Sequence, residues 1–367
     1  MSADVLVVGG GPAGLAAAIA ARMKNLRVAV VDPRQPPIDK ACGEGLLPEA
    51  VAALRQLGVS LDSSLAAPFA GFRFADGHSS ATAKIPRGKA FGLRRTVLHR
   101  LLIDRATEMG VSLLWGTRLS SLDSHNVAVD GHLFPCRWIV GADGQNSNVR
   151  QSARLGPARY RPSRFGFRLH YAIAPWTDLV EVHWGSKTQM IVTPTATNEI
   201  CISLFSNDSG LRVARALDRF PEIAERLRAA RPVSTEAGAV TSLGRARVVA
   251  RGNVALVGDA SCMVDAVSGQ GLSLAFQQAL DLADALARGD LALYEAAHPR
   301  LTRNAMRMTR LMLLMNASAA LRRKVLRLFA ARPALFAKMI SIHTSSFESD
   351  PLNAAQILDL GLRVLLA

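Results

Sequence analysis

The residue types best suited to chemistry gather in the stretch Asp39–Pro48, which reads DKACGEGLLP. Cys42 stands there between a lysine and two glycines, so it could be a reactive thiol or a small side chain where the backbone approaches a ligand. The other cysteines, Cys136, Cys201 and Cys262, show no CxxC spacing and no paired histidines. This pattern argues against a zinc site or a disulfide framework, so we expect no metal and a reducing compartment.

A nucleotide-binding pattern precedes this stretch. Asp4–Val8 is an apolar run typical of a buried strand, and the turn GGGPAG at positions 9–14, an alanine-rich helix and a second strand ending at Asp32 follow it. In such a unit the first glycine permits a tight turn, the second lets the backbone approach a pyrophosphate, and the third lets the helix pack on the strand. The helix N-terminus would stabilise phosphate charge, and Asp32 would bind a ribose. The sequence therefore predicts a dinucleotide site.

Two later segments repeat the change from strand to glycine-containing turn. A strand ending near Val140 enters the turn GADG at positions 141–144, and the strand Asn253–Val257 enters Gly258-Asp259. The sequence SGQGL at positions 268–272 then opens a helix that runs to about Leu286. Each of these is, by itself, an ordinary turn between two elements.

Taken together and in this order, the three motifs resemble those of the flavoprotein hydroxylase and geranylgeranyl-reductase superfamily, which binds FAD. The resemblance covers residues 4 to about 286. It implies that Asp259 binds the ribityl chain, that Asp143 lies near the pyrophosphate and that Arg95 contacts the cofactor. It also implies that the helix beginning near Gly271 points its positive end at the flavin, which is anionic when reduced. The residues expected to bind FAD are Gly9, Gly11, Pro12, Ala13, Gly14, Asp32, Pro33, Arg34, Cys42, Gly43, Arg95, Asp143, Gly258, Asp259, Gly269, Gln270, Gly271 and Leu272.

The same resemblance gives DKACGEGLLP a place beside the cofactor. Because it follows the second strand closely, the chain there would run along the cofactor, with Gly43 against the flavin and Lys40 or Arg34 near the pyrophosphate. A helix over Leu46–Leu57 would close the pocket. Cys42 is then either a small residue of the wall or a catalytic thiol, and both interpretations stay open.

Between the flavin motifs lie segments in which apolar and polar residues alternate, as in a sheet with one covered face. They are Phe69–Ala75, Ser80–Ile85, Phe165–Ile173, Leu179–Trp184, Gln189–Thr193 and Glu199–Leu204. In the resembled family such insertions form an antiparallel sheet over the flavin that carries the substrate pocket. The side chains that could face it are His170, Tyr171, His183, Trp184 and Thr193, although packing within the sheet is the commoner role for each. The sequence assigns no catalytic base, and the weak catalytic candidates are Cys42, His170, Tyr171 and Trp184.

The C-terminal part mixes methionine and leucine with arginine between Arg303 and Phe336, which predicts amphipathic helices broken at Pro333. Their apolar faces could pack on the FAD-binding domain or line a channel for a lipophilic substrate, and their basic faces could rest on an anionic membrane. The predicted fold class is α/β, with a discontinuous GxGxxG Rossmann-like FAD-binding domain (residues 1–68, 95–158 and 245–300). An inserted antiparallel-sheet substrate domain (69–94 and 159–244) and a C-terminal helical region (301–367) complete it.

Composition limits the partners. The 367 residues carry a net charge of +15, mostly from dispersed arginines, while aromatic residues make up 5% and do not interleave with the basic ones. That argues against nucleic acid and in favour of anionic cofactors or lipid headgroups. The longest apolar runs fall far short of the roughly 20 residues that span a bilayer, and the N-terminus opens on a strand rather than on a signal peptide. We expect a cytoplasmic protein that could lie at a membrane surface.

Three kinds of flavin chemistry occur in this superfamily. Halogenases carry a W-x-W-x-I-P motif, which the four tryptophans do not form. Geranylgeranyl-type reductases are similar in the CGEG sequence, but the counterpart of their Y-x-W-x-F-P stretch is Thr188–Pro194, which keeps the proline and loses the aromatics. Aromatic hydroxylases are similar in the spacing from Gly258 to Leu272, but they usually place a proline near Asp265.

The sequence thus favours a monooxygenase that uses NAD(P)H and a flavin hydroperoxide to hydroxylate an apolar phenolic or polyketide-like compound. Since no second GxGxxG occurs, the reductant would bind transiently or come from another protein. The alternatives are a flavin-dependent C=C reductase of lipid or isoprenoid chains and a non-catalytic electron-relay flavoprotein.

Overall fold

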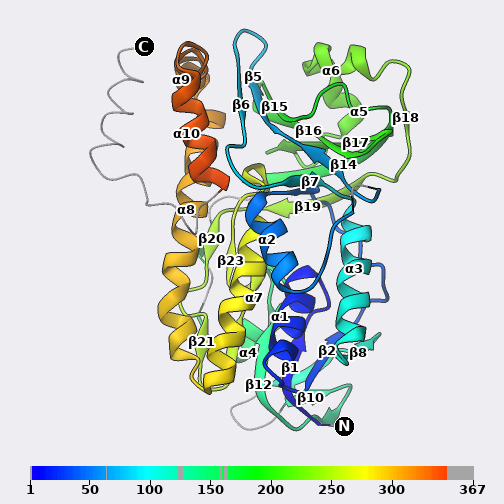
Figure 1. Cartoon of the computed structure of the whole chain (residues 1–367), viewed down its shortest axis with the longest axis vertical. Coiled ribbons are helices and arrows are strands. Elements are labelled where there is room, and N and C mark those ends of the chain that lie inside the picture. Colours follow the sequence, from blue (N-terminus) through cyan, green and yellow to red (C-terminus); the bar gives the residue numbers. More distant parts are fainter. Residues whose placement is uncertain (1, 63, 123–126, 157–158, 161–163, 345–367) are drawn as a thin grey trace.

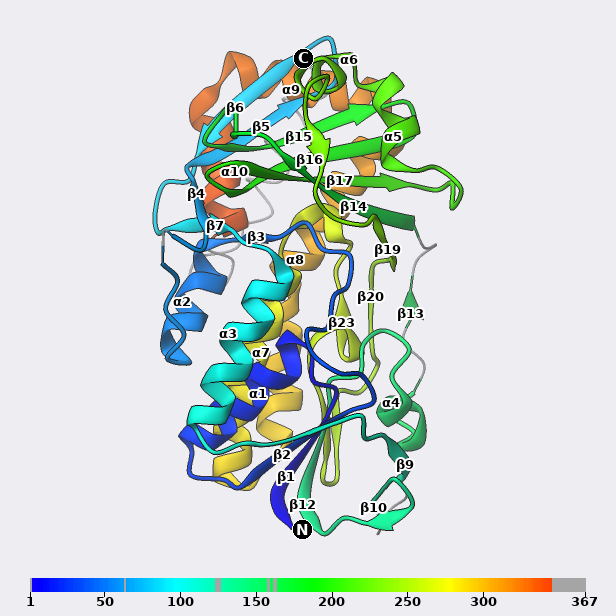
Figure 2. The same ribbon diagram turned by 90° about the vertical axis from the view of Figure 1, so that its right-hand side faces the viewer.

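The structure is a computed structural model that describes residues 2–62, 64–122, 127–156, 159–160 and 164–344 (Figure 1). Two sheets lie towards opposite ends of an elongated molecule, and a long helix runs beside both of them (Figures 1 and 2). Among the described helices none is long and apolar enough to cross a membrane.

The first sheet is mainly parallel and carries the predicted nucleotide-binding unit. Its strands are, in spatial order, β21 (Ala250–Arg251), β22 (Val254–Leu256), β12 (Cys136–Gly141), β1 (Ala3–Val8), β2 (Val28–Asp32) and β8 (Ser112–Trp115). Only β21 pairs in the antiparallel direction, with β22. The central strands are short runs of valine, alanine and leucine, as expected of parallel strands covered on both faces. The predicted strands that precede the three glycine turns are confirmed.

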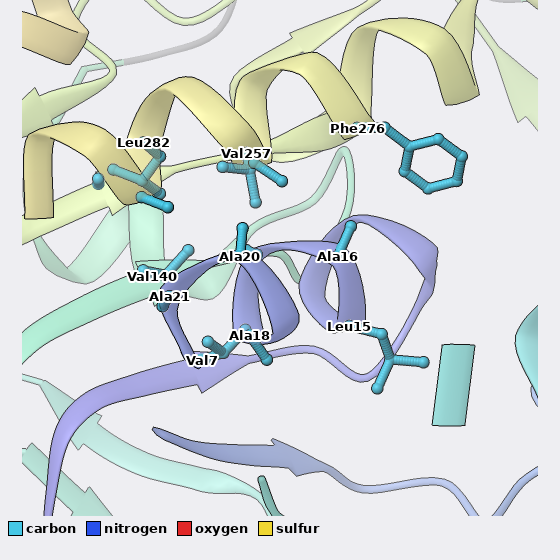
Figure 3. Close-up of a cluster of buried hydrophobic side chains, with 14 of the residues drawn as sticks. Val7, Leu15, Ala16, Ala18, Ala20, Ala21, Val140, Val257, Phe276 and Leu282 are labelled. Carbon is cyan, nitrogen blue, oxygen red and sulfur yellow. The ribbon is translucent and has the colours of Figure 1, made fainter. Parts of the chain in front are cut away.

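An alanine-rich helix covers the middle of this sheet. α1 (Pro12–Met23) packs between β1 and α7 (Gly271–Arg288), and its small side chains let both neighbours approach closely. Figure 3 shows Ala18 beside Val7 of β1, while Ala20 points towards Val257 and α7. The helix predicted to start near Gly271 is therefore confirmed as α7. It packs in the same apolar core as α1, the helix that follows the first glycine turn.

The second sheet is the predicted insertion. Its strands are, in spatial order, β18 (Arg231–Pro232), β14 (Arg164–Ala172), β17 (Glu199–Ser206), β16 (Thr188–Ala196), β15 (Leu179–Gly185), β5 (Gly71–Ala75) and β6 (Ser80–Lys84), with β19 (Ala237–Thr241) also on β14. All pairs are antiparallel except β15 with β5. The six predicted segments correspond to β5, β6, β14, β15, β16 and β17. The proposed domain boundaries stay a prediction.

Three small three-stranded sheets complete the strands of the described residues. They comprise β9 (Leu119–Leu122), β10 (Val127–Val129) and β11 (His132–Leu133); β13 (Arg159–Tyr160), β20 (Gly244–Arg245) and β23 (Cys262–Met263); and β3 (Gly45–Leu46), β4 (Ala67–Phe69) and β7 (Ala90–Gly92). The remaining helices are α2 (Pro48–Gln56), α3 (Arg95–Glu108), α4 (Asn148–Ser152), α5 (Val213–Ala216), α6 (Pro221–Arg226), α8 (Ala292–Ala317), α9 (Ala319–Ala331) and α10 (Pro333–Thr344), with 3-10 turns at Leu217–Arg219, Gly258–Ala260 and Ala266–Ser268.

The C-terminal helices cover one face of the second sheet. α9 and α10 both contact β6, and the break between them falls at Arg332, directly before Pro333, as predicted. The opposite face is covered by α5 and α6, which share a separate apolar cluster with it. The second sheet is therefore covered on both faces, so its polar side chains also point towards one or the other of these covered faces.

Candidate functional site

One continuous cavity of about 460 Å³ joins the two sheets. At one end it is lined by the turns that follow β1, β12 and β22, whose carboxyl ends meet at the same edge of the parallel sheet. At the other end it enters the space between the second sheet and α8 to α10. A cavity at that edge of an open α/β sheet is the usual place for a nucleotide ligand.

The end beside the parallel sheet is shaped by glycine backbone. A Cβ added at Gly144, Gly269 or Gly271 would meet no atom within 4 Å, and one at Gly11 would meet only Arg95, at 3.9 Å. α1 and α7 both begin at this end, and neither has a side-chain cap on its first N–H groups. Uncapped N-termini of long helices attract negative charge, so this half suits a phosphate-bearing ligand with a flat, closely approaching part.

Charged side chains complete the polar half. Arg34, Lys40 and Arg95 line it, and the Lys40 ammonium forms an ion pair with Asp259, with 3.1 Å between Nζ and Oδ2. Two buried atoms here, Arg95 Nε and Asp143 Oδ1, have no hydrogen-bond partner among the described residues. Buried polar groups are rarely left unsatisfied, so both are suited to bind a ligand. The residues of the polar half therefore fit FAD, because its cations and the N-termini of α1 and α7 suit the negative charge of this cofactor.

Several residues predicted to bind FAD do not line this cavity. Gly9 and Gly14 serve packing, since a Cβ at Gly14 would lie 1.8 Å from the Gly9 carbonyl oxygen. Pro33 is exposed, and Gln270 donates from its amide to the carbonyl oxygen of His343. The other residues of the predicted set line it: Gly11, Pro12, Ala13, Arg34, Cys42, Gly43, Arg95, Asp143, Gly258, Asp259, Gly269, Gly271 and Leu272.

Asp32 is also buried outside the cavity wall, where it is bonded to the turns around it. Its carboxylate accepts hydrogen bonds from the backbone N–H of Gly10 (2.8 Å) and of Arg34 (2.9 Å). Burial opposes its ionisation, but these bonds and the Arg34 guanidinium outweigh that effect and lower the pKa of Asp32. The acid thus fixes the glycine turn, and its predicted contact with a ribose stays a prediction.

The loop that contains Cys42 forms a side of the cavity between its two halves. Lys40, Cys42 and Gly43 line it, and the Cys42 side chain is half-buried. Glu44 follows with φ of 59°, in the left-handed region that non-glycine residues rarely adopt. Its buried carboxylate accepts from the backbone N–H of Arg95, at 3.0 Å.

A buried polar cluster lies behind this loop. Glu44, His170 and Cys201 bring one possible ligand atom each within 4.8 Å of one another. The Arg168 guanidinium, however, lies 4.0 Å from the Glu44 carboxylate and 3.3 Å from His170 Nδ1. A fixed positive charge in this position opposes a metal cation, so we interpret the cluster as a hydrogen-bond network.

The other half of the cavity is apolar. Phe72 and Phe74 of β5 line one side, and Met312 and Met315 of α8 line the other. Phe329, Phe336, Met339 and Ile340 close its end. The predicted amphipathic helices contribute Met308, Leu311, Met312 and Met315 to the cavity lining, whereas Met306 contacts Cys262 and Leu314 is 56% exposed.

The structure separates the candidates on the second sheet. Thr193 lines the cavity, and His170 points towards the Cys42 loop, where its Nε2 lies 2.5 Å from Glu44. Tyr171 does not face the cavity, because it lies on the other face of β14, in the cluster with α5 and α6. His183 also points away and pairs with Glu181, at 3.0 Å. Trp184 packs edge-on against Phe74 beyond the cavity wall.

Sequence reasoning missed Glu44, Arg168 and the aromatic pair on β5. An acidic residue between two glycines was the available signal for Glu44, because a buried carboxylate in such a turn requires partners. No local pattern marks Arg168, since its partners Asp39 and Glu44 lie more than a hundred residues earlier.

Comparison with known proteins agrees with this geometry. A family model described as FAD binding domain matches residues 2–303. The menaquinone reductase of Mycolicibacterium smegmatis is 29% identical over 330 residues, which cover 82% of this chain and 80% of that protein. Digeranylgeranylglycerophospholipid reductase 1 of Methanopyrus kandleri is 28% identical over 310 residues, covering 75% and 78%. The rifampicin monooxygenase of Rhodococcus hoagii is 33% identical over 159 residues, covering 40% of this chain and 33% of that protein.

Solved structures share the whole architecture at low sequence identity. The structure of a flavin-dependent brominase superposes with a TM-score of 0.81 at 18% identity, covering 98% of each chain. At that identity the similarity shows the fold alone. It includes the second sheet and the C-terminal helices as well as the nucleotide-binding unit.

Proposed function

The chain belongs to the FAD binding domain family and is an FAD-dependent oxidoreductase, and we propose that it saturates a carbon–carbon double bond in a long apolar chain of isoprenoid type. The observation that carries this proposal is the apolar half of the cavity. It continues directly from the place that fits the flavin and is lined by aliphatic, methionine and phenylalanine side chains from β5, β15 and α8 to α10. Methionine side chains adapt to a flexible apolar ligand, whereas a small phenol would leave much of this space unfilled.

The extent of similarity supports the same substrate class. Both reductases named above match three quarters or more of this chain, a share that must include much of the second sheet. The monooxygenase matches only 40% of it. Substrate choice depends on the substrate site rather than on the cofactor-binding unit. A match that extends across the second sheet therefore says more about the substrate than a match over a shorter part of the chain.

The residues of the chain would divide the work as follows. When bound and reduced, FAD supplies hydride chemistry. The uncapped N-terminus of α7 stabilises negative charge at the flavin end, and Arg34, Lys40 and Arg95 hold the phosphates. Phe72, the other apolar side chains and α8 hold the chain and exclude water from it. NAD(P)H is the proposed reductant.

Hydroxylation of an apolar compound is the second candidate. The rifampicin monooxygenase has the highest identity of the three relatives, although over a shorter segment. Both activities need the same cofactor site and an apolar pocket, so the reaction itself must separate them. We put the reductase first because a long lining of flexible side chains suits a chain better than a ring.

A basic face on α8 suggests where such a substrate comes from. Arg303, Arg307 and Arg310 are exposed at spacings of four and three residues, so they share one face with Leu314. Within the described ranges none of these arginines forms an ion pair. The same helix lines the cavity with Met308 and other residues. We propose that this face rests on an anionic lipid surface, from which an isoprenoid lipid enters.

A substrate panel tests the proposed function. Purified enzyme with FAD is reduced under anaerobic conditions and mixed with isoprenoid quinones, isoprenoid diphosphates or apolar phenols. The proposal predicts that the isoprenoid diphosphates, which have no quinone ring to accept the electrons, reoxidise the flavin without oxygen, at a rate that increases with chain length. Reoxidation that requires oxygen and is stimulated only by phenols would establish hydroxylation instead.

A further inference from the structure

The loop Asp39–Glu44 is tied at both ends to the same strand of the second sheet. The Arg168 guanidinium donates to the Asp39 carboxylate, with 2.6 Å between Nη2 and Oδ1. His170 Nε2 lies 2.5 Å from Glu44 Oε2. Arg168 and His170 are two residues apart on β14, so they project from one face and reach the two ends of the loop side by side.

The hydrogen on the His170 ring can be assigned from the groups that surround its two nitrogens. His170 Nδ1 lies 3.3 Å from Arg168 Nη1 and 3.0 Å from the Ser234 hydroxyl oxygen, while the Glu44 carboxylate beside Nε2 offers acceptors only. His170 Nε2 therefore carries a hydrogen and donates it to Glu44. The side chains of Arg168, His170 and Glu44 are 3%, 2% and 1% exposed. Bonds to a carboxylate at such depth are strong and costly to break.

Glu44 transmits this restraint to the loop backbone. Its left-handed conformation is unfavourable for a residue with a side chain, and it persists only where surrounding bonds determine it. The carboxylate accepts from Arg95 N–H as well as from His170, and the Glu44 carbonyl accepts from Leu93 N–H at 2.9 Å. Glu44 is therefore fixed by the start of α3 and by β14 at once.

Between the two tied ends lie Lys40, Ala41, Cys42 and Gly43, all of which line the cavity. We propose that Arg168 and His170 are positioning residues that hold this loop as the cavity wall and thereby set the position and exposure of the Cys42 thiol. The inference rests on the proposed function only in taking this wall to face the substrate. Its consequence for the thiol can be measured without any substrate.

The test is the rate at which iodoacetamide alkylates Cys42 in FAD-loaded enzyme, followed peptide by peptide by mass spectrometry. His170→Asn is too short to reach Glu44, whereas His170→Gln places an amide N–H where Nε2 was. If Arg168 and His170 hold the loop in this way, His170→Asn raises the alkylation rate of Cys42 by about fivefold or more, because the rate follows the population of the opened loop. His170→Gln stays within about twofold of the unchanged protein. Cys136, which lies on β12 outside the cavity lining, is the internal reference and should not change.

Asp39 supplies a second variant at the other end of the loop, where its own side chain is 43% exposed, so that the substitution leaves no cavity in the core. Asp39→Ala removes the other tie and should raise the Cys42 rate about threefold. The proposal is overturned if Asp39→Ala, or an FAD-loaded His170→Asn, is alkylated like the unchanged protein, or if His170→Gln reacts as fast as His170→Asn. With an active substrate, His170→Asn should lower kcat more than it raises KM. If no double bond is reduced, the proposed function fails but the alkylation pattern stands.

Discussion

Lys40 and Asp259 form an ion pair across the polar half of the cavity, with 3.1 Å between Nζ and Oδ2. The pair joins the loop after β2 to the turn after β22, which are 219 residues apart in the chain. Both side chains are more than a third exposed, so their mutual attraction contributes little to stability. The pair instead places one positive and one negative group beside the space that a charged ligand with hydroxyl groups would occupy.

Replacing this lysine should weaken FAD binding without weakening the fold. Lys40→Gln removes a charge near the expected pyrophosphate and should raise the Kd for FAD by about tenfold, since a charge-assisted hydrogen bond contributes about 1.5–3 kcal/mol. Fluorescence titration of the apoprotein measures the Kd, and thermal unfolding checks the fold. Lys24→Gln is the matched control, because Lys24 pairs with Asp284 outside the cavity. Equal Kd values for FAD in the two variants would show that Lys40 does not contribute to cofactor binding.

Two glycines should separate cofactor space from packing. Gly271→Ala adds a methyl group where the chain itself leaves at least 4 Å free, so the apoprotein should be as stable as before. The methyl group would project into the flavin end and should lower FAD affinity by about tenfold or more. Gly14→Ala, whose Cβ would overlap the Gly9 carbonyl oxygen, should lose folded protein as well. Unchanged FAD affinity in Gly271→Ala would show that the flavin does not lie there.

Cys42 is expected to act as part of the wall rather than as a nucleophile. Its backbone N–H and carbonyl lie in a clamped loop, and its sulfur accepts from the backbone N–H of Glu44 at 3.4 Å. Cys42→Ala should keep bound FAD and hold turnover within about threefold, because only a small contact is lost. A fall of about a thousandfold with FAD still bound would instead make the thiol catalytic.

Filling the apolar half should shorten the accepted substrate. Met312 is 5% exposed and lines the cavity from α8. Met312→Trp should lower turnover of a long isoprenoid chain by about tenfold and leave a short analogue within about threefold, since added volume displaces only the far end. Met312→Leu, which conserves volume, is the control. Equal losses for long and short substrates would indicate general disruption instead of a length limit.

The arginine face of α8 should bind anionic lipid. Arg307→Glu with Arg310→Glu should reduce co-sedimentation with phosphatidylglycerol vesicles by about tenfold or more, because each basic residue contributes about 1 kcal/mol near such a surface. Arg55→Glu with Arg100→Glu changes the net charge equally on α2 and α3, and both of these arginines are exposed. In Figure 1 α3 lies across the molecule from α8. If both pairs lose binding equally, net charge and not this face is responsible.

The sequence could predict the nucleotide half of the site because its signals are local. Glycine spacing, the strands before each turn and Asp259 all lie within short segments, and their placement follows from parallel strands ending at one edge. The substrate half was harder, because both faces of the second sheet are covered. On β14 the neighbours His170 and Tyr171 point to opposite faces, and alternation alone cannot tell which face meets the cofactor. The hydrogen bonds that hold Glu44 join segments far apart in the chain, so no local sequence pattern marks them.

The mass of the product tests the central claim most directly. Dithionite-reduced, FAD-loaded enzyme is incubated anaerobically with a menaquinone in phosphatidylglycerol vesicles, and the lipid is analysed by mass spectrometry. The extract is first oxidised in air, because dithionite or reduced flavin also converts the quinone ring to a quinol, with the same gain of two hydrogens. Saturation of a double bond survives this step, so we expect a product heavier by about 2 Da whose two added hydrogens lie in the side chain. An unchanged lipid under these conditions, together with an oxygen-dependent gain of about 16 Da in an aromatic compound, would contradict the account and establish a hydroxylase.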